Sequence, residues 1–215
     1  QPSERMPSRG ICASLWGKGL PALCGTHPYS KDENGGSFVM RKFTTRDLVL
    51  SAIVAALYVV MGYFGNIFGL TFGAVQIRFA EALTVLPFLF PATAPGLALG
   101  CLITNLLSPY GPIDIVMGTL ATAIAAYLTI KMPRWYLAAL PPIVVNAIIL
   151  PPMWAWAGVG AVNSAFWAAW GLNVITFVIG EVAACYVLGT LLLKFLPKIR
   201  YFRAMIPQHH LAQRF

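Results

Sequence analysis

Residues 76–107, QIRFAEALTVLPFLFPATAPGLALGCLITNLL, are apolar almost throughout and carry only two charged side chains. These are Arg78 and Glu81, which stand three residues apart where the apolar run begins. Pro91 and Pro95 interrupt the run and divide it into two short segments. Charge at the start of such a run either anchors the chain at a water boundary or belongs to a site.

The composition of the whole chain excludes a soluble domain. Of its 215 residues, 58% are hydrophobic and 10% are charged, and the mean hydropathy is +0.72. Soluble domains carry about 25% charged residues. The apolar runs are long, and the alternation typical of membrane β-barrel strands is absent. The sequence therefore predicts an all-α integral membrane protein built as a helical bundle.

Six apolar segments follow Met40, and we expect each of them to span the membrane as one helix of the bundle. The second and third are short, which is tolerable where a helix packs against protein or lines a cavity. The predicted membrane domain covers residues 40–200, with a tail over 201–215. The predicted spans are residues 47–65, 79–92, 94–108, 113–130, 136–152 and 169–194.

The basic residues lie at the ends of alternate spans, the pattern that the positive-inside rule predicts. They account for most of the formal net charge of +8 without a nucleic-acid role. We therefore expect both termini to be cytoplasmic and loops 66–78, 108–112 and 154–168 to face outward. Arg78 is then the one basic residue after Met40 on the outer side. The inner basic residues are Arg41, Lys42, Arg46, Lys131, Arg134, Lys194, Lys198, Arg200 and Arg203.

Residues 1–39 differ from the rest of the chain. They are rich in Pro, Gly and Ser, and they lack a periodic pattern and the apolar core of a signal peptide. The codons of two adjacent glycines, a few residues before Met40, can spell a ribosome-binding sequence. We therefore expect residues 1–39 to be a non-native leader, translated from upstream RNA, and the natural chain to start at Met40. A disordered extension is the alternative. Thr44 or Thr45 can cap the first helix, and Asp47 suits its first turn.

Three acidic side chains lie in or beside the later spans, namely Glu81, Asp114 and Glu181. An ionised side chain in a span costs at least about 2.5–3.5 kcal/mol, so each is a candidate functional residue. Each also has a structural explanation. Glu81 can pair with Arg78, Asp114 suits a helix N-terminus, and Glu181 can hydrogen bond to another helix. Glu181 is the strongest candidate, because it lies near mid-bilayer without a basic neighbour in sequence.

Asn173, Phe177 and Glu181 recur at four-residue spacing and so share one helix face. Asparagines elsewhere add amide donors and acceptors toward the outer side, and tryptophans flank the last outer loop. The tryptophans fit an interfacial belt, or stacking of one or two of them on a planar ligand. We expect an outward-facing pocket for a small planar molecule, neutral or cationic. These further residues are Asn105, Asn146, Asn163, Trp154, Trp156, Trp167 and Trp170.

The first span carries small residues at four-residue spacing, in the pairs Ser51 with Ala55 and Ala52 with Ala56. Such pairs let another helix approach closely. No HExxH, GxSG or GxGD motif of an enzyme is present, nor a Walker A sequence. The four cysteines have no metal-type spacing, so no metal and no cofactor is predicted. Uphill transport would need energy from a partner or from an ion gradient.

Two runs, VQIRFAEALTVLPFLFPATAPGLALGCLITNLL and DIVMGTLATAIAAYLT, resemble the QueT family. These proteins are substrate-binding S components of energy-coupling factor (ECF) transporters for queuosine precursors. The resemblance covers about residues 41–200 and is densest over 75–130. It implies a six-helix protein in a prokaryotic plasma membrane that docks on a coupling membrane protein and two ATPases. In that class an AxxxA element contacts the coupling protein, and Ala52 and Ala56 match it.

The resemblance also implies a substrate, a 7-deazaguanine such as queuine or its aminomethyl precursor prequeuosine. The expected arrangement has Glu181 or Glu81 on the guanine edge and Asp114 near the amine. Amides would support these contacts, and an aromatic ring would face the base. The predicted substrate-binding residues are Arg78, Glu81, Asn105, Asp114, Asn146, Asn173, Phe177 and Glu181.

Four other interpretations are weighed, and the first two remain open. The chain can be an S component for another vitamin, or a proton-coupled carrier that uses Glu181 as its relay. A small intramembrane enzyme is disfavoured by the missing motifs. A purely structural subunit does not explain three acids and an arginine beside apolar spans.

Overall fold

The computed structural model describes residues 43–70, 76–203 and 205–206. They belong to one compact unit, Arg41–Phe215, and every regular element among them is helical. The predictions for residues 1–39, for a start at Met40 and for most of the tail lie outside the described residues.

The described elements are α-helices and short segments of tighter or wider winding that lie between some of them. The α-helices are α1 (Thr45–Ile67), α2 (Ala94–Asn105), α3 (Pro112–Ile130), α4 (Leu140–Val159), α5 (Ser164–Val182), α6 (Thr190–Phe195) and α7 (Arg200–Arg203). The 3₁₀ segments are η1 (Phe79–Phe88), η2 (Pro91–Thr93), η3 (Trp135–Leu137) and η5 (Leu196–Lys198), and η4 (Ala183–Gly189) is a π-helix.

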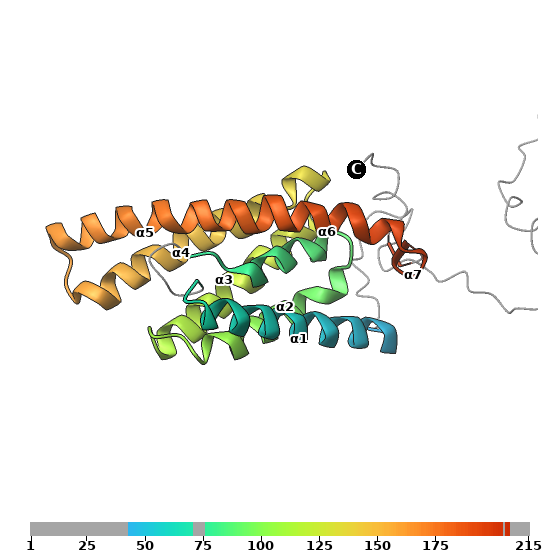
Figure 1. Cartoon of the computed structure of the whole chain (residues 1–215), viewed down its shortest axis with the longest axis horizontal. Helices are drawn as coiled ribbons and strands as arrows, with labels where there is room; N and C mark the ends of the chain where they lie inside the picture. The colour runs from blue at the N-terminus through green and yellow to red at the C-terminus, as the bar shows by residue number, and fades with distance from the viewer. Residues whose placement is uncertain (1–42, 71–75, 204, 207–215) are drawn as a thin grey trace, which may run out of the picture. The chain divides into compact units, whose positions relative to one another are not determined.

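Four helical runs in the described residues are long and apolar enough to cross a membrane. They contain α1, α3, α4 and the continuous run Ser164–Lys198, which Figure 1 shows as one long helix from α5 into α6. Two shorter apolar elements, η1 and α2, complete the set. The chain is therefore an all-helical, multi-pass membrane protein, and a count of six spans remains a prediction.

The boundaries of the last two predicted spans were wrong. The predicted outer loop over 154–168 is largely helical, because α4 continues to Val159 and α5 begins at Ser164. The predicted fifth span ended at residue 152, whereas Pro151 and Pro152 lie inside α4. Membrane helices tolerate proline where neighbouring helices and side chains satisfy the freed backbone groups. The helix ends at Gly160, whose φ of 75° is one that glycine adopts easily.

Segment η1 lies at the centre of the bundle. Consecutive α-helices from α1 to α5 pack side by side, while η1 packs against η4, α3 and α1 (Figure 1). Every residue from Ala80 to Phe88 is buried. A short 3₁₀ segment is stable at membrane depth here because protein surrounds it and no lipid meets its backbone.

Small residues allow the closest helix contact, between α1 and α2. A Cβ added at Gly96 would collide with the backbone oxygen of Ser51, and one at Gly100 would meet the Ala55 oxygen at 2.9 Å. Ser51 and Ala55 therefore lie on the face of α1 that packs inside the chain, whereas Ala52 and Ala56 lie on its exposed face.

The first helix begins as predicted. Thr44 and Asp47 form a reciprocal capping box, in which the Thr44 side chain accepts from the Asp47 backbone N–H at 3.3 Å. At the C-terminal end of α3, Lys131 lies 4.2 Å from the centre of the Tyr127 ring. Lys194 lies over the Trp135 ring, at 5.1 Å, so α6 packs against η3, the segment that follows α3.

The contact of Gly96 with Ser51 gives a test of the α1–α2 packing. Gly96→Ala should lower the free energy of unfolding by about 1–3 kcal/mol, because the added methyl group forces two backbones apart. Gly171→Ala is the matched control, since nothing lies within 4 Å of its added Cβ, and it should be neutral or stabilising by about 0.5–1 kcal/mol. Thermal unfolding of the purified protein measures both. Equal stability of the two variants would contradict this packing.

Candidate functional site

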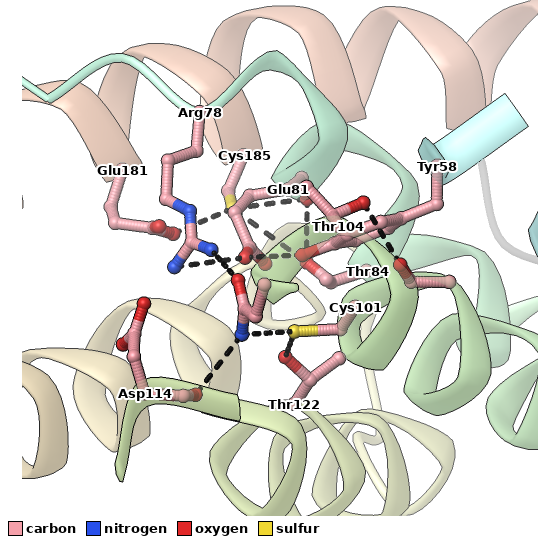
Figure 2. Close-up of polar contacts among 12 residues, drawn as sticks. Tyr58, Arg78, Glu81, Thr84, Cys101, Thr104, Asp114, Thr122, Glu181 and Cys185 are labelled. Atoms are coloured by element: carbon pink, nitrogen blue, oxygen red, sulfur yellow. Dashed lines mark hydrogen bonds and ion pairs between the residues drawn. The ribbon is translucent and has the colours of Figure 1, made fainter. Parts of the chain in front are cut away.

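The buried charged side chains of the described residues are Arg78, Glu81, Asp114 and Glu181, with exposed fractions of 3%, 0%, 0% and 1%. They come from three elements far apart in the sequence: the start of η1, the first turn of α3 and the end of α5. Figure 2 shows them facing one another across the bundle interior. Arg78 thus lies inside the protein and not at its surface, which favours a site over an anchor.

Arg78 connects η1 to its neighbours. Its Nη1 lies 3.9 Å from Glu81 Oε1, and its Nη2 donates a hydrogen bond of 2.8 Å to Asn105 Oδ1 (Figure 2). Glu81 Oε1 also accepts a 2.7 Å hydrogen bond from the Tyr58 hydroxyl of α1. The sequence-predicted pairing of Arg78 with Glu81 is present, and it is buried instead of lying at the water boundary.

Asn105 is the junction between this pair and α3. Its Nδ2 donates to the backbone oxygen of Asp114 at 3.2 Å and to Cys101 Sγ at 3.4 Å. Gly118 makes room for the amide, because a Cβ at that position would collide with Asn105 Nδ2. The amide therefore fixes the positions of the Arg78 guanidinium and the start of α3 together.

Asp114 is not a helix cap. Gly111 is the N-cap of α3, and no side chain caps this helix end. Asp114 Oδ1 instead accepts a 3.1 Å hydrogen bond from Trp154 Nε1. The Trp154 ring stacks on Tyr110 at 5.5 Å and meets Phe177 edge-on at 5.4 Å. Burial raises the pKa of the Tyr110 hydroxyl, and the negative charge of Asp114 adds to the effect.

Glu181 lies at the middle of the continuous helical run Ser164–Lys198. Its Oε2 lies 3.5 Å from Cys185 Sγ, and the thiol is also 3.5 Å from the backbone oxygen of Glu81. The Asn146 amide interacts with Glu181, yet its geometry falls short of a hydrogen bond. Neither side-chain atom of Asn146 has a hydrogen-bond partner among the described residues. The run turns from α-helix to π-helix directly after this site, a change often found at functional positions.

Several buried polar atoms of these side chains have no hydrogen-bond partner among the described residues. A buried polar atom without a partner costs about 1–3 kcal/mol, and natural interiors contain few of them. Their concentration here indicates a site that accepts N–H donors and can also donate from an amide. The atoms are Glu81 Oε2, Asp114 Oδ2, Glu181 Oε1, Gln76 Oε1 and both side-chain atoms of Asn146.

Two residues, Tyr58 and Gln76, were not among the predicted site residues, and Trp154 was predicted only as an interfacial or ligand-stacking residue. Tyr58 follows Ser51 and Ala55 on the buried face of α1. Trp154 follows Asn146 by two turns of α4, a spacing that places both on one face. Gln76 carried no such signal, because its position depends on a close contact of its backbone oxygen with Gly180. The interfacial-belt interpretation is wrong for Trp154, which is 2% exposed.

The other predicted residues lie farther from the cluster or serve the fold. Phe177 is buried, whereas Asn173 on the same face is only half-buried. Asn163 caps α5 by accepting from the Phe166 backbone N–H at 3.0 Å. Trp156 and Trp167 are about half exposed, as residues of an interfacial belt would be.

Two other kinds of site receive no support from the described residues. No group of three His, Cys, Asp or Glu side chains among them could hold a metal ion. An apolar hollow of about 290 Å³ lies at Val60, Met61, Phe64 and Phe79, but it lacks the polar groups that fix the orientation of a planar, hydrogen-bonding ligand.

The junction at Asn105 can be tested by its effect on stability. Asn105→Ala removes the acceptor of the Arg78 hydrogen bond and should lower the free energy of unfolding by about 1.5–3 kcal/mol, the range for a bond to a charged group. Asn163→Ala, which removes an exposed helix cap, should cost only about 1 kcal/mol. Thermal unfolding compares the two. A smaller loss for Asn105→Ala than for Asn163→Ala would refute the junction.

A family model and a curated relative both show similarity of this chain to QueT transporters. A family model described as QueT transporter matches residues 48–198. The queuosine precursor transporter QueT of Lactococcus lactis subsp. cremoris (strain MG1363) is 34% identical over 85 residues, which are 40% of this chain and 50% of that protein. The match thus spans about half the length of this relative, and no solved structure matches. On the family match, which covers most of its length, the chain belongs to the QueT transporter family.

Proposed function

We propose that this protein is the substrate-capture subunit of an ECF-type transporter that imports a queuosine precursor, a 7-deazaguanine such as queuine or prequeuosine. It binds the substrate in an outward-facing pocket, and partner ATPases supply the energy. The family and the name of the Lactococcus relative support transport of such a precursor. Prokaryotic plasma-membrane location, with both termini in the cytoplasm, belongs to the same proposal.

The observation that carries the proposal is the buried cluster of carboxylates with unpaired oxygens. A guanine edge presents adjacent N–H donors, and one carboxylate can accept two of them. Glu81 Oε2 and Glu181 Oε1 are buried acceptors without a partner among the described residues. The unpaired amide of Asn146 can serve the carbonyl of the base.

The other predicted residues take more limited roles in this proposal. Asn105 positions Arg78 and does not contact the ligand, because its oxygen and nitrogen already have protein partners. Phe177 supplies an aromatic surface for the base, and Asn173 lies at the outer margin of the pocket. Arg78 holds Glu81 and balances part of the negative charge.

The position of the cluster along the bundle supports an outward-facing pocket. Asn105 ends α2 and Asp114 lies in the first turn of α3. Lys131 follows the opposite end of α3, which is the cytoplasmic end under the positive-inside rule. The cluster therefore lies in the half of the protein that we assign to the outside.

Ligand binding by acid-to-amide variants tests the proposal. Glu181→Gln and Asp114→Asn should each weaken the binding of prequeuosine by roughly 30-fold or more, because each removes a buried charged acceptor. Asp47→Asn, the same change at a partly exposed acid outside the cluster, is the control. Thermal shift measures binding, since ligand at 100 times its Kd stabilises the wild type by about 2.7 kcal/mol. Unchanged affinity in both cluster variants would sink the assignment.

Docking of partner subunits is proposed for the exposed face of α1. Ala52 and Ala56 present small side chains there, while Ser51 and Ala55 are covered by α2. Large side chains at Ala52 and Ala56 should block a close helix contact with the coupling protein.

The corresponding experiment is co-purification with the coupling protein and ATPases. Ala52→Leu with Ala56→Leu should abolish the complex and leave ligand binding unchanged. Ala168→Leu makes the same change at another exposed alanine and should have no effect. A complex that survives the double substitution would exclude this face as the docking surface.

Two other functions are candidates. The chain can be an S component for another vitamin, or it can be a proton-coupled carrier. The position of Glu181 at the middle of a membrane-length helix favours a proton relay. Uptake that persists without ATPase subunits and collapses with the proton gradient would support the carrier. Uptake that requires the ATPases would support the ECF subunit.

A further inference from the structure

The buried cluster contains more acids than bases. Among the described residues, one buried guanidinium, Arg78, faces the carboxyl groups of Glu81, Asp114 and Glu181. If all four groups are ionised, the cluster carries two surplus negative charges. Such a surplus is costly in a membrane protein interior. A positively charged ligand would reduce it.

The two oxygens of Asp114 differ in their surroundings. Oδ1 is held by the indole N–H of Trp154, at 3.1 Å. Oδ2 is buried and has no hydrogen-bond partner among the described residues. Trp154 thus fixes the carboxylate in one orientation and leaves a single oxygen for another donor.

Aromatic rings gather around the indole that holds this carboxylate. Trp154 stacks on Tyr110 and contacts Phe177 edge-on, and all three pack with apolar residues of α3 and α4. Such walls exclude water and lower the local dielectric constant, so that the attraction between a carboxylate and an ammonium group becomes stronger.

The other two acids are already engaged by the chain. Glu81 has Arg78 at 3.9 Å and the Tyr58 hydroxyl at 2.7 Å. Glu181 has the Cys185 thiol at 3.5 Å and also feels the charge of Arg78. Asp114 also interacts with the charge of Arg78, but its one side-chain hydrogen bond among the described residues comes from a neutral donor, the Trp154 indole.

We propose that Asp114, oriented by Trp154, whose ring packs against Tyr110 and Phe177, is a subsite for a protonated amine of the ligand. The protein therefore selects cationic over neutral deazaguanines. This inference rests on the proposed function and specifies which substrates of that class the site takes. Asp114 contacts the amine, and Trp154 is a positioning residue.

A matched pair of ligands tests the subsite on the unmodified protein. One is the deazaguanine with an aminomethyl group, which is cationic at neutral pH, and the other carries a neutral cyano group at the same position. The wild type should bind the aminomethyl compound at least about 30-fold more tightly, the effect of a desolvated charge pair. Equal affinities would overturn the subsite.

Substitutions then locate the selectivity. Asp114→Asn should reduce the affinity ratio of the two ligands to near one, because it weakens the aminomethyl compound far more than the cyano compound. Trp154→Phe keeps an aromatic wall but removes the N–H, and it should lower the ratio part of the way. Glu181→Gln is the control within the cluster and should weaken both ligands in parallel. A ratio that Asp114→Asn leaves unchanged would overturn the assignment to Asp114.

Two further compounds test the substrate class on which this inference rests. Thiamine is a cationic vitamin and riboflavin is a neutral one. Stabilisation of the wild type by thiamine or riboflavin alone would overturn the deazaguanine substrate and with it the subsite, because neither vitamin carries a protonated amine at neutral pH. Binding of both deazaguanines with equal affinity would support the function and overturn the subsite. Binding of none of these compounds would overturn both.

Discussion

The arrangement of η1, α2 and α3 depends on the contacts of one buried group, the guanidinium of Arg78. It binds Asn105 at the end of α2 and pairs with Glu81 one turn into η1. Through Asn105 it also fixes the start of α3. A charge at this depth is stable only with such partners. The same bonds that hold η1 at the centre of the bundle therefore also position two of the three buried acids.

The fold explains why a short 3₁₀ segment can hold this centre. Gly180 lets the backbone of Gln76 lie directly against α5. Gly189 leaves room for the Val85 side chain, since a Cβ added at Gly189 would lie only 3.0 Å from Val85 Cγ1. The chain before and within η1 thus packs along the run from α5 to α6. Glu181 lies between these two glycines, so the close packing also determines where its carboxylate faces.

Much of the fold follows from the sequence, and the site follows only in part. Long apolar runs predicted α1 and α3 within a few residues, and the cost of burying charge singled out Glu81, Asp114 and Glu181. The end of α4 was missed, because neighbouring elements decide whether proline breaks a membrane helix. That error placed Trp154 in a loop and hid its bond to Asp114. Gln76 depends on a contact between segments far apart in sequence.

The central claim is that the buried acids of η1, α3 and α5 bind the transported ligand. The most direct measurement is an experimental structure of the purified protein with the aminomethyl deazaguanine bound. Our account predicts ligand density between Glu181 and Asp114, with the amine at Asp114 Oδ2. Density in the apolar hollow at Val60 and Phe79, with the acids unchanged, would contradict the account.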